Sequence, residues 1–197
     1  MLGYNGSGKS TTFKAITNEI LLNNGNIEIF NYDTKKDIEV LRQNIGYCPQ
    51  SSALFDNLTV EETFNFYSKI RSKLHVRSCA LNDDLLRDFG LLQYKNTLSK
   101  NLSGGNQRKL NFAIALMNKP CLVLLDEPST GVDPESRRIM WKHINDIQKT
   151  NDLFNLVLST HSLEEAEILC DKIGWMKNGN FICIGNPEKL KFEFSEV

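Results

Sequence analysis

The sequence predicts an α/β fold with a mainly parallel sheet and an inserted helical segment, on three observations. Short apolar runs typical of buried strands alternate with helical patterns, as in domains that cover a parallel sheet with helices. A glycine-rich loop stands directly before the first helical pattern. From Leu54 to Met117 the pattern is helical and almost free of strands. A length of 197 residues suffices for one domain with such an insertion.

The first part of the chain predicts a helix and two strands. The helix is expected from about Lys9 to Leu22, and it should end at an Asn-rich turn in which Gly25 can adopt a positive φ. The apolar runs Ile27–Phe30 and Ile45–Cys48 are typical of strands.

The helical segment that follows contains two apolar faces with helical spacing, which predict amphipathic helices. The residues that share these faces are Val60, Phe64, Tyr67 and Ile70 on the first, and Leu110, Ala113, Ile114 and Met117 on the second.

The last part of the chain returns to alternating strands and helices. Cys121–Leu125 predicts a buried strand, and the next helix should have Asp133 as its N-cap and Pro134 at its first position. Asn155–Thr160 predicts another apolar strand, which is followed by a capping box at Ser162–Glu165. A closing hairpin is expected from the strands Ile173–Met176 and Phe181–Gly185 and the turn Lys177–Gly179.

The stretch from Gly3 to Ser10 has the spacing of a phosphate-binding loop. Gly6 and Gly8 allow backbone N–H groups to turn toward phosphate oxygens in conformations that a side chain would obstruct. Lys9 supplies a positive charge for the β- and γ-phosphates, and the N-terminus of the following helix adds to it. The Ser10 hydroxyl is an oxygen ligand of the kind that Mg²⁺ prefers. The loop therefore predicts binding of phosphates together with Mg²⁺.

Two adjacent carboxylates, Asp126 and Glu127, follow the apolar strand that begins at Cys121. In open α/β sheets ligands lie outside the carboxyl ends of the strands, so we expect both side chains near the phosphate loop. Asp126 should hold Mg²⁺, directly or through water, and Glu127 should polarise the attacking water. An ordinary Asp-Glu turn is the alternative.

Gln50 and His161 also stand at the ends of predicted strands. The amide oxygen of Gln50 can reach Mg²⁺ or the attacking water, while its backbone reports the state of the site to the helical segment. The imidazole of His161 can contact the γ-phosphate. A lone glutamine at a strand end means little, and a lone histidine is more often structural, but the neighbouring motifs favour a functional role for both.

Ser103, Gly104 and Gly105 expose backbone N–H groups at the start of the second predicted amphipathic helix. This is a second helix N-terminus that can bind an anion, and it lies far in sequence from the first loop. Two phosphate-binding ends in one chain suggest two half-sites. Alone, the segment would be interpreted as an N-cap turn that contains glycine.

Composition argues against several other classes of protein. The net charge is −1, from 23 basic and 24 acidic residues without a dense basic cluster, which argues against a nucleic-acid partner. Apolar runs such as Cys121–Leu125 are far shorter than the about 20 residues that cross a bilayer, and no signal peptide is visible. The five cysteines are odd in number and contain no C-x-x-C pair, which favours reduced core thiols.

Together these motifs resemble the nucleotide-binding domain of ABC (ATP-binding cassette) transporters over essentially the whole chain. The motifs in the family's order are Walker A (Gly3–Ser10), the Q-loop (Gln50), the signature (Leu102–Asn106), Walker B (Leu122–Asp126) with Glu127, the D-loop (Ser129–Asp133) and the switch histidine (His161). The resemblance implies a P-loop NTPase (RecA-like) core of residues 1–50 and 118–197, with an all-helical ABC subdomain at residues 51–117.

The resemblance also implies ligands, partners and location. Two such domains would sandwich two ATP molecules head to tail, so that Ser103 and Gly105 contact the γ-phosphate held by the partner and Asp133 lies at the seam. The implied catalytic residues are Glu127, His161 and Gln50. The implied nucleotide-contacting residues are Gly3, Asn5, Gly6, Ser7, Gly8, Lys9, Ser10, Thr11, Ser103, Gly104, Gly105 and Asp133. The implied Mg²⁺ ligands are Ser10, Gln50 and Asp126. ATP hydrolysis would drive attached transmembrane domains from the cytosolic face of a membrane.

Finer features are similar to the A subfamily, many members of which move or extrude lipids. They are the stretches "CPQSSALFDNLTVEET", "LSGGNQRKL", "DEPSTGVDPESRR", "STHSLEEAEILCD" and "CIGNPEKLK". Asn106 and Gln107 depart from the commonest end of the signature, with little expected loss. A lipid substrate is implied by this analogy alone.

The start of the chain departs from the family's pattern. The family has an upstream antiparallel sheet, an aromatic residue that stacks on adenine and a strand that leads into the P-loop, whereas only Met1 and Leu2 precede Gly3 here. We therefore expect an N-terminally truncated domain that folds poorly alone and binds adenine weakly.

Two alternatives stay open. The first is a soluble ABC ATPase of translation or DNA repair. The stretch between Ser10 and Leu102 is too short for the long coiled coil of the repair type, and the translation type normally pairs two cassettes in one soluble chain. The second is a regulatory module that binds nucleotide without turnover, against which Glu127 and His161 argue.

Overall fold

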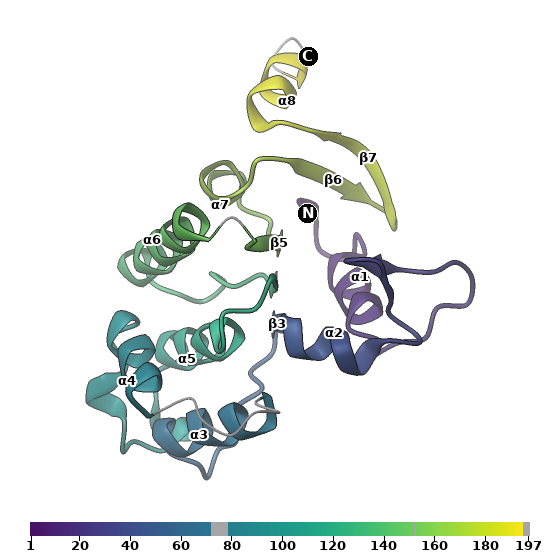
Figure 1. Ribbon diagram of the computed structural model, residues 1–197. Coiled ribbons are helices and arrows are strands. Elements are labelled where there is room, and N and C mark those ends of the chain that lie inside the picture. Colours follow the sequence, from purple (N-terminus) through teal and green to yellow (C-terminus); the bar gives the residue numbers. More distant parts are fainter. Residues whose placement is uncertain (72–78, 152, 195–197) are drawn as a thin grey trace.

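The central sheet of the computed structural model consists of parallel strands in the order β3-β4-β5 (Figure 1). The structure describes residues 1–71, 79–151 and 153–194. The strands are β3 (Ile45–Cys48), β4 (Leu122–Asp126) and β5 (Asn155–Ser159). The register pairs Cys48 with Leu125 and Asp126 with Ser159, so the carboxyl ends of all three strands meet at one edge. The predicted α/β fold with a parallel sheet is confirmed.

The start of the chain extends this sheet. Leu2 forms parallel bridges with Thr160 on one side and with Trp175 on the other. Through these bridges the parallel sheet continues into the antiparallel hairpin of β6 (Ile173–Lys177) and β7 (Asn180–Gly185). The predicted hairpin and its turn are confirmed, and the phosphate loop leaves the sheet between β5 and β6.

Helices cover both faces of the sheet, as Figure 1 shows. On one face lie α5 (Gly104–Leu116) and α6 (Pro134–Thr150), and on the other lie α1 (Lys9–Ile16) and α2 (Ile38–Asn44). The side chains of β4 alternate between the layers: Val123 and Leu125 pack in the cluster of α5 and α6, whereas Leu122 and Leu124 pack with Phe13 and Leu41. Burial on both faces explains why this strand is apolar without alternation.

The helical segment between β3 and β4 contains more elements than α5. They are α3 (Val60–Arg71), α4 (Cys79–Asp88) and the short 3₁₀ turns Leu92–Tyr94 and Ser99–Asn101. Val60 and Phe64 are buried, but Ile70, which was predicted on the same apolar face, is 64% exposed. The α3 helix contacts α5 through its earlier turns, so its last turn extends past the core.

The predicted amphipathic character of α5 is wrong. Every residue from Leu110 to Leu116 is buried. The helix lies between the sheet, against β3 and β4, and the layer of α3, α4 and α6, so it has no solvent-facing side over this stretch. The apolar face from Leu110 to Met117 is therefore buried as predicted, and the polar residues Arg108 and Asn111 of the same helix are buried with it.

The first helix is shorter than predicted and ends at Ile16 instead of Leu22. The Thr17 hydroxyl donates to the carbonyl oxygens of Phe13 and Lys14, and Asn18 has a φ of 57°. A residue in the left-handed region ends a helix, so the chain turns away before the Asn-rich turn. That turn does place Gly25 at a positive φ, as predicted.

Several elements were not predicted as such. They are β2 (Tyr32–Asp33), α2 and α8 (Pro187–Phe194), whereas β1 (Glu28–Ile29), which pairs with β2, is a shorter form of the strand predicted at Ile27–Phe30. Cys48, Cys121, Cys170 and Cys183 are free thiols.

The predicted helix caps form, with one exception. Asp133 accepts a hydrogen bond from the Ser136 N–H at 2.9 Å and Pro134 opens α6. Ser162 caps α7 (Leu163–Leu169) by accepting from the Glu165 N–H. The reciprocal half of the capping box is absent, because the buried Glu165 carboxylate instead accepts the Trp141 indole N–H at 2.9 Å. Glu165 thus joins α7 to α6.

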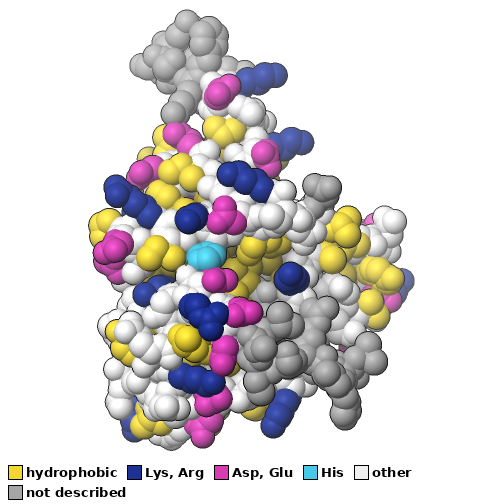
Figure 2. All heavy atoms as spheres, turned by 60° about the vertical axis from the view of Figure 1, so that its left-hand side comes forward, with side chains coloured by type: hydrophobic (Ala, Val, Ile, Leu, Met, Phe, Trp, Pro, Cys, Tyr) yellow, Lys and Arg dark blue, Asp and Glu magenta, His cyan; other side chains and the backbone are white. Residues whose placement is uncertain are grey.

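Charges are mixed on the face of the molecule that Figure 2 presents. Figure 2 shows acidic and basic side chains interspersed over the face that it presents. Such a face lacks the single-sign field that attracts a polyanion. Among the described residues, no helix combines the length and apolar character needed to span a bilayer.

Candidate functional site

A cavity of about 290 Å³ lies at the carboxyl edge of the sheet. Its lining residues are Asn5, Gly6, Gly8, Lys9, Ser10, Thr11, Gln50 and Glu127. They come from the loop before α1, the loop after β3 and the end of β4. The strand order brings these distant segments to one place, as the sequence predicted from strand ends. Gly3 and Ser7 belong to the same loop but do not line the cavity.

The phosphate loop has the backbone shape that its glycines predict. Gly6 and Gly8 have φ values of 79° and 106°, a region that side chains rarely adopt. A Cβ on Gly8 would lie 3.3 Å from the Cα of Gly179, and the Ser7 carbonyl accepts a hydrogen bond from the Gly179 N–H at 2.9 Å. The turn between β6 and β7 therefore supports the loop from behind.

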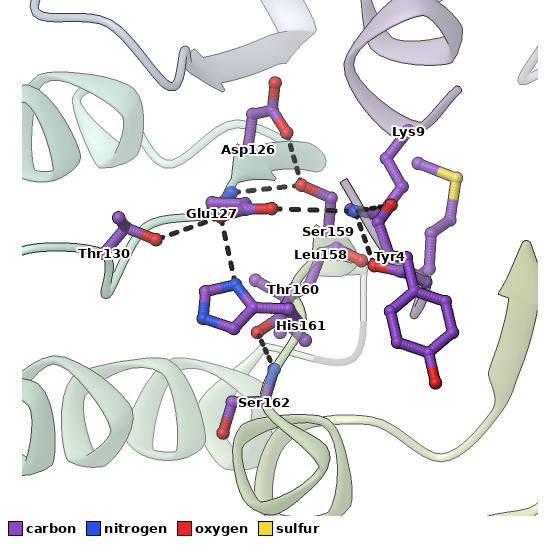
Figure 3. Close-up of polar contacts among 12 residues, drawn as sticks. Tyr4, Lys9, Asp126, Glu127, Thr130, Leu158, Ser159, Thr160, His161 and Ser162 are labelled. Carbon is purple, nitrogen blue, oxygen red and sulfur yellow. Dashed lines mark hydrogen bonds and ion pairs between the residues drawn. The ribbon is translucent and has the colours of Figure 1, made fainter. Parts of the chain in front are cut away.

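Lys9 is folded into its own loop and is only 5% exposed. Its Nζ donates to the carbonyl oxygens of Gly3 at 2.7 Å and Tyr4 at 3.1 Å, and it lies 3.6 Å from Glu127 Oε1 (Figure 3). Lysine and glutamate, far apart in sequence, thus form an ion pair across the cavity. The lysine is held where it can exchange this carboxylate for an anionic ligand.

Glu127 stands directly after β4 with a strained backbone. Its φ is 48°, a conformation that costs a non-glycine residue about 1–3 kcal/mol. Its N–H donates to the carbonyl oxygen and to the hydroxyl of Ser159, each at 3.0 Å. Its Oε2 lies 3.1 Å from both Thr130 Oγ1 and His161 Nδ1 (Figure 3). The main chain and the side chain of this residue are thus both held, by the end of β5 and by its own loop.

Asp126 points away from the ion pair. Its carboxylate is 1% exposed, accepts a hydrogen bond from the Ser159 hydroxyl and does not line the cavity. In Figure 3 it lies on the far side of Ser159 from Lys9. The two adjacent carboxylates therefore have different surroundings.

The residues at the other two strand ends differ in exposure. Gln50 follows β3 and lines the cavity. His161 follows β5 and does not line it, since its side chain is 61% exposed and contacts the cavity through Glu127. An exposed imidazole that bonds the buried carboxylate can be reached by a ligand from outside.

The signature residues and Asp133 form a separate region. The Ser103 hydroxyl caps α5 by accepting from the Asn106 N–H at 3.3 Å, and Ser103 and Gly104 are exposed. A Cβ on Gly105 would lie 3.8 Å from Asp133 Oδ2, so the starts of α5 and α6 are neighbours. None of these residues lines the cavity. The structure thus has two distinct groups of predicted site residues.

The donor set fits Mg²⁺ when a phosphate ligand is present. Ser10 and Gln50 offer a hydroxyl and an amide to the same cavity, with the Asp126 carboxylate behind it. These are the hard oxygen donors that Mg²⁺ uses, usually together with substrate phosphates. The described residues contain no cluster of three or more acidic, histidine or cysteine side chains that would hold a metal unaided. The ion would therefore depend on the nucleotide.

Three residues of the site were missed in the sequence. Ser159 joins Asp126 to the Glu127 N–H, Thr130 donates to Glu127, and Arg108 donates to the main chain around them. Ser159 gave a signal, because it is a polar residue that ends an apolar strand, whereas Arg108 stands among polar residues and gave none.

Burial and hydrogen bonding change two titrations near these segments. Burial raises the pKa of the Cys48 thiol on β3 to about 11. At the other region, the Ser136 N–H holds the pKa of Asp133 below its ordinary value, which keeps this N-cap ionised.

The comparison with sequence families agrees with the geometry. The ABC transporter family matches residues 1–130. "Phospholipid-transporting ATPase ABCA3" of Rattus norvegicus is 40% identical over 194 residues, or 98% of this chain and 11% of the relative. "ATP-binding cassette sub-family A member 2" of Homo sapiens is 38% identical over 196 residues, or 100% of this chain and 8% of the relative. The chain thus spans about a tenth of the length of these relatives.

Solved structures give the same fold. "Structure of ATP binding subunit of ABC transporter" superposes with a TM-score of 0.86 at 28% identity, covering 98% of this chain and 80% of that one. "Dimeric structure of a post-hydrolysis state of the ATP-binding cassette MJ0796 bound to ADP and Pi" gives a TM-score of 0.85 at 23% identity, covering 94% and 83%. The second likeness shows the fold alone. With its ordered motifs, its fold and the match over residues 1–130, the chain belongs to the ABC transporter family.

Proposed function

We propose that this chain is the ATP-binding and ATP-hydrolysing domain of a lipid-moving ABC transporter. One observation carries the proposal: the phosphate loop, Gln50 and Glu127 come from three distant segments and line one cavity. The relatives named phospholipid-transporting ATPases support the reaction and the class of cargo, although no residue of this domain is assigned to a lipid.

Binding would begin with an exchange of partners at Lys9. Its Nζ lies 3.6 Å from Glu127 Oε1, and the β- and γ-phosphates would replace the carboxylate as its anionic partner. The N-terminus of α1 and the loop's N–H groups add partial positive charge at the same point. Lys9 is already buried and oriented, so little side-chain entropy is lost when the nucleotide arrives.

Glu127 would then orient the attacking water and accept its proton. Thr130 and His161 hold its carboxylate, and release from Lys9 leaves Oε1 available as an acceptor. Ser10, Gln50 and Asp126 would hold Mg²⁺, which when bound neutralises charge on the phosphates.

A second ABC nucleotide-binding domain would complete the site. Ser103, Gly104 and Gly105 carry the second anion-binding helix N-terminus but lie outside this cavity. Facing the cavity of another copy, head to tail, they would contact its γ-phosphate, with Asp133 beside Gly105 at the seam. Hydrolysis would remove the bridging charge and let the pair reopen.

The transmembrane domains of the transporter would use this opening and closing. The domain would therefore work on the cytosolic face of a membrane, as part of an integral membrane protein. The mixed surface charge of Figure 2 gives no support to a nucleic-acid partner.

Phosphate release by the intact protein in lipid vesicles tests the proposal. Wild type should hydrolyse MgATP. Lys9→Ala should lose both ATP binding and turnover, whereas Glu127→Gln should keep binding and lose turnover. The matched controls are Lys14→Ala, an exposed lysine of the same helix, and Glu135→Gln, an exposed glutamate near Glu127 in sequence. Both should behave as wild type.

The outcomes separate the alternatives. Wild type that binds ATP without turnover would indicate a regulatory module. Steady-state turnover retained by Glu127→Gln would contradict the role of that residue. ATP hydrolysis without lipid movement would indicate another cargo.

A further inference from the structure

Arg108 is a buried arginine whose hydrogen bonds all go to main-chain carbonyl oxygens. It lies on α5, is 7% exposed and donates from all three nitrogens of its guanidinium. The acceptors are Pro128 for Nε at 3.1 Å, Pro49 and Gln50 for Nη1 at 2.5 and 3.0 Å, and Asp126 and Glu127 for Nη2 at 2.6 and 2.7 Å.

These contacts satisfy the guanidinium completely. Its five N–H donors, in a fixed planar fork, meet five different carbonyl oxygens. Lysine has only three donors and glutamine two, so no other side chain can make this set of bonds. The chemistry therefore requires arginine, and not just a positive charge.

The five acceptors belong to two catalytic segments. Pro49 and Gln50 form the loop after β3, while Asp126, Glu127 and Pro128 form the loop after β4. Arg108 itself comes from α5, whose first turn presents Ser103 and Gly104. One side chain thus fixes three motifs that are distant in sequence to one another.

The bond to Glu127 matters most, because this residue has a strained backbone. Its φ of 48° turns its peptide groups away from the directions that they would have in a strand. Ser159 holds its N–H and Arg108 holds its carbonyl oxygen at 2.7 Å. Removal of the arginine would leave this carbonyl oxygen with the 3.2 Å bond from the Thr130 N–H of its own loop, so the strained conformation would lose its link to α5.

We propose that Arg108 is a positioning residue for ATP hydrolysis, which holds the main chain of Glu127 and Gln50 in register with the signature helix. It touches neither nucleotide nor water. It sets where the Glu127 carboxylate points, and it transmits a displacement of α5 to the two loops together. This inference rests on the proposed hydrolysis function.

The test compares Arg108→Lys with a matched control, Asn111→Ala, in the intact protein. Asn111 is 4% exposed and lies one turn further along α5. It bonds Ser52 and Ala53 beyond Gln50, and no group of the loop after β4. Both changes remove buried hydrogen bonds from α5, but only the first releases Glu127.

Rates are expressed per ATP-binding site, so that loss of folded protein does not lower the measured kcat. Arg108→Lys should reduce kcat about 10- to 100-fold, the effect of a displacement of roughly 1 Å at a reacting group. The KM for ATP should change much less, because Lys9 and the phosphate loop are untouched. Asn111→Ala should keep the wild-type kcat.

A second readout uses the double variant with Glu127→Gln. If Arg108 acts through Glu127, then Arg108→Lys should add almost nothing to the loss caused by Glu127→Gln, since residues acting as a unit are non-additive. A multiplicative loss would overturn the proposal. Wild-type kcat in Arg108→Lys would also overturn it, and so would an equal loss of kcat in Asn111→Ala.

If Arg108→Lys is not recovered folded, Arg108→Gln replaces it, since a neutral amide costs less to bury than an ammonium group. A fall of kcat in this variant supports the proposal and wild-type kcat overturns it. Absence of ATP hydrolysis in the wild type would instead refute the proposed function itself.

Discussion

Removal of the Ser159 hydroxyl tests what holds the side chains of Asp126 and Glu127 in different directions. The Ser159 Oγ donates to the Asp126 carboxylate and accepts from the Glu127 N–H, and both Ser159 and Asp126 are almost fully buried. Ser159→Ala deletes one oxygen without changing the strand. The Glu127 N–H keeps the Ser159 carbonyl oxygen as its acceptor, so the main loss is the hydrogen bond to the carboxylate.

The magnitude follows from the type of bond. A hydrogen bond to a charged group contributes about 1.5–3 kcal/mol, against about 0.5–1.5 kcal/mol between neutral groups. We expect the free energy of local opening at the site to fall by about 2 kcal/mol. Amides that exchange through this opening should then exchange about 30-fold faster. The control Thr63→Val removes a neutral buried hydrogen bond between the hydroxyls of Thr63 and Ser99, which lie 3.3 Å apart. It should accelerate exchange only about fivefold.

Hydrogen–deuterium exchange with mass spectrometry of the intact protein measures both variants. For Ser159→Ala the change should appear in peptides of β4 and β5, and for Thr63→Val in α3. Exchange of β4 and β5 within about twofold of wild type in Ser159→Ala would refute the inference that this hydroxyl holds the site together.

Two further predictions concern the sheet. Gly46→Ala should prevent normal packing, because its Cβ would lie 2.0 Å from the Ala115 carbonyl oxygen; we expect the free energy of unfolding to fall by about 1–3 kcal/mol or more, seen as lower yield and faster proteolysis. The control Gly104→Ala should not lower stability, because its Cβ would meet no atom within 4 Å. Equal effects of the two changes would contradict the argument. Cys48 should resist alkylation at pH 9 while Cys183 reacts, because burial raises the Cys48 pKa from 9.0 to about 11. The unfolded chain then loses this proton at lower pH than the folded one, so stability should fall as the pH rises above about 9; rapid native labelling of Cys48, measured by peptide mass, would show that β3 is not buried.

The sequence predicted those parts of the structure that depend on local chemistry. Gly6 and Gly8 have the positive φ values that their loop requires, and Asp133 and Pro134 start α6 as caps do. The convergence of Gln50 and Glu127 on the phosphate loop followed from a general rule about strand ends, so it could also be predicted.

The parts that were missed depend on tertiary contacts. The apolar spacing of Leu110 to Met117 suggested an exposed opposite face, but α5 is enclosed by the sheet and by other helices. Nothing local shows that Arg108 turns inward to carbonyl oxygens of two other loops. Likewise Glu165 fits a capping box by spacing, yet the indole of Trp141 from another helix takes its carboxylate.

The support of the phosphate loop by the β6–β7 turn has a consequence for synthesis of the protein. Gly179 donates its N–H to the Ser7 carbonyl and packs behind Gly8, yet it is synthesised long after both of them. A nascent chain that has been made only as far as Lys177 contains every glycine of the phosphate loop but lacks the turn that supports this loop. The ability to bind a nucleotide would therefore arise only when the β6–β7 hairpin has emerged, long after the phosphate loop itself is made.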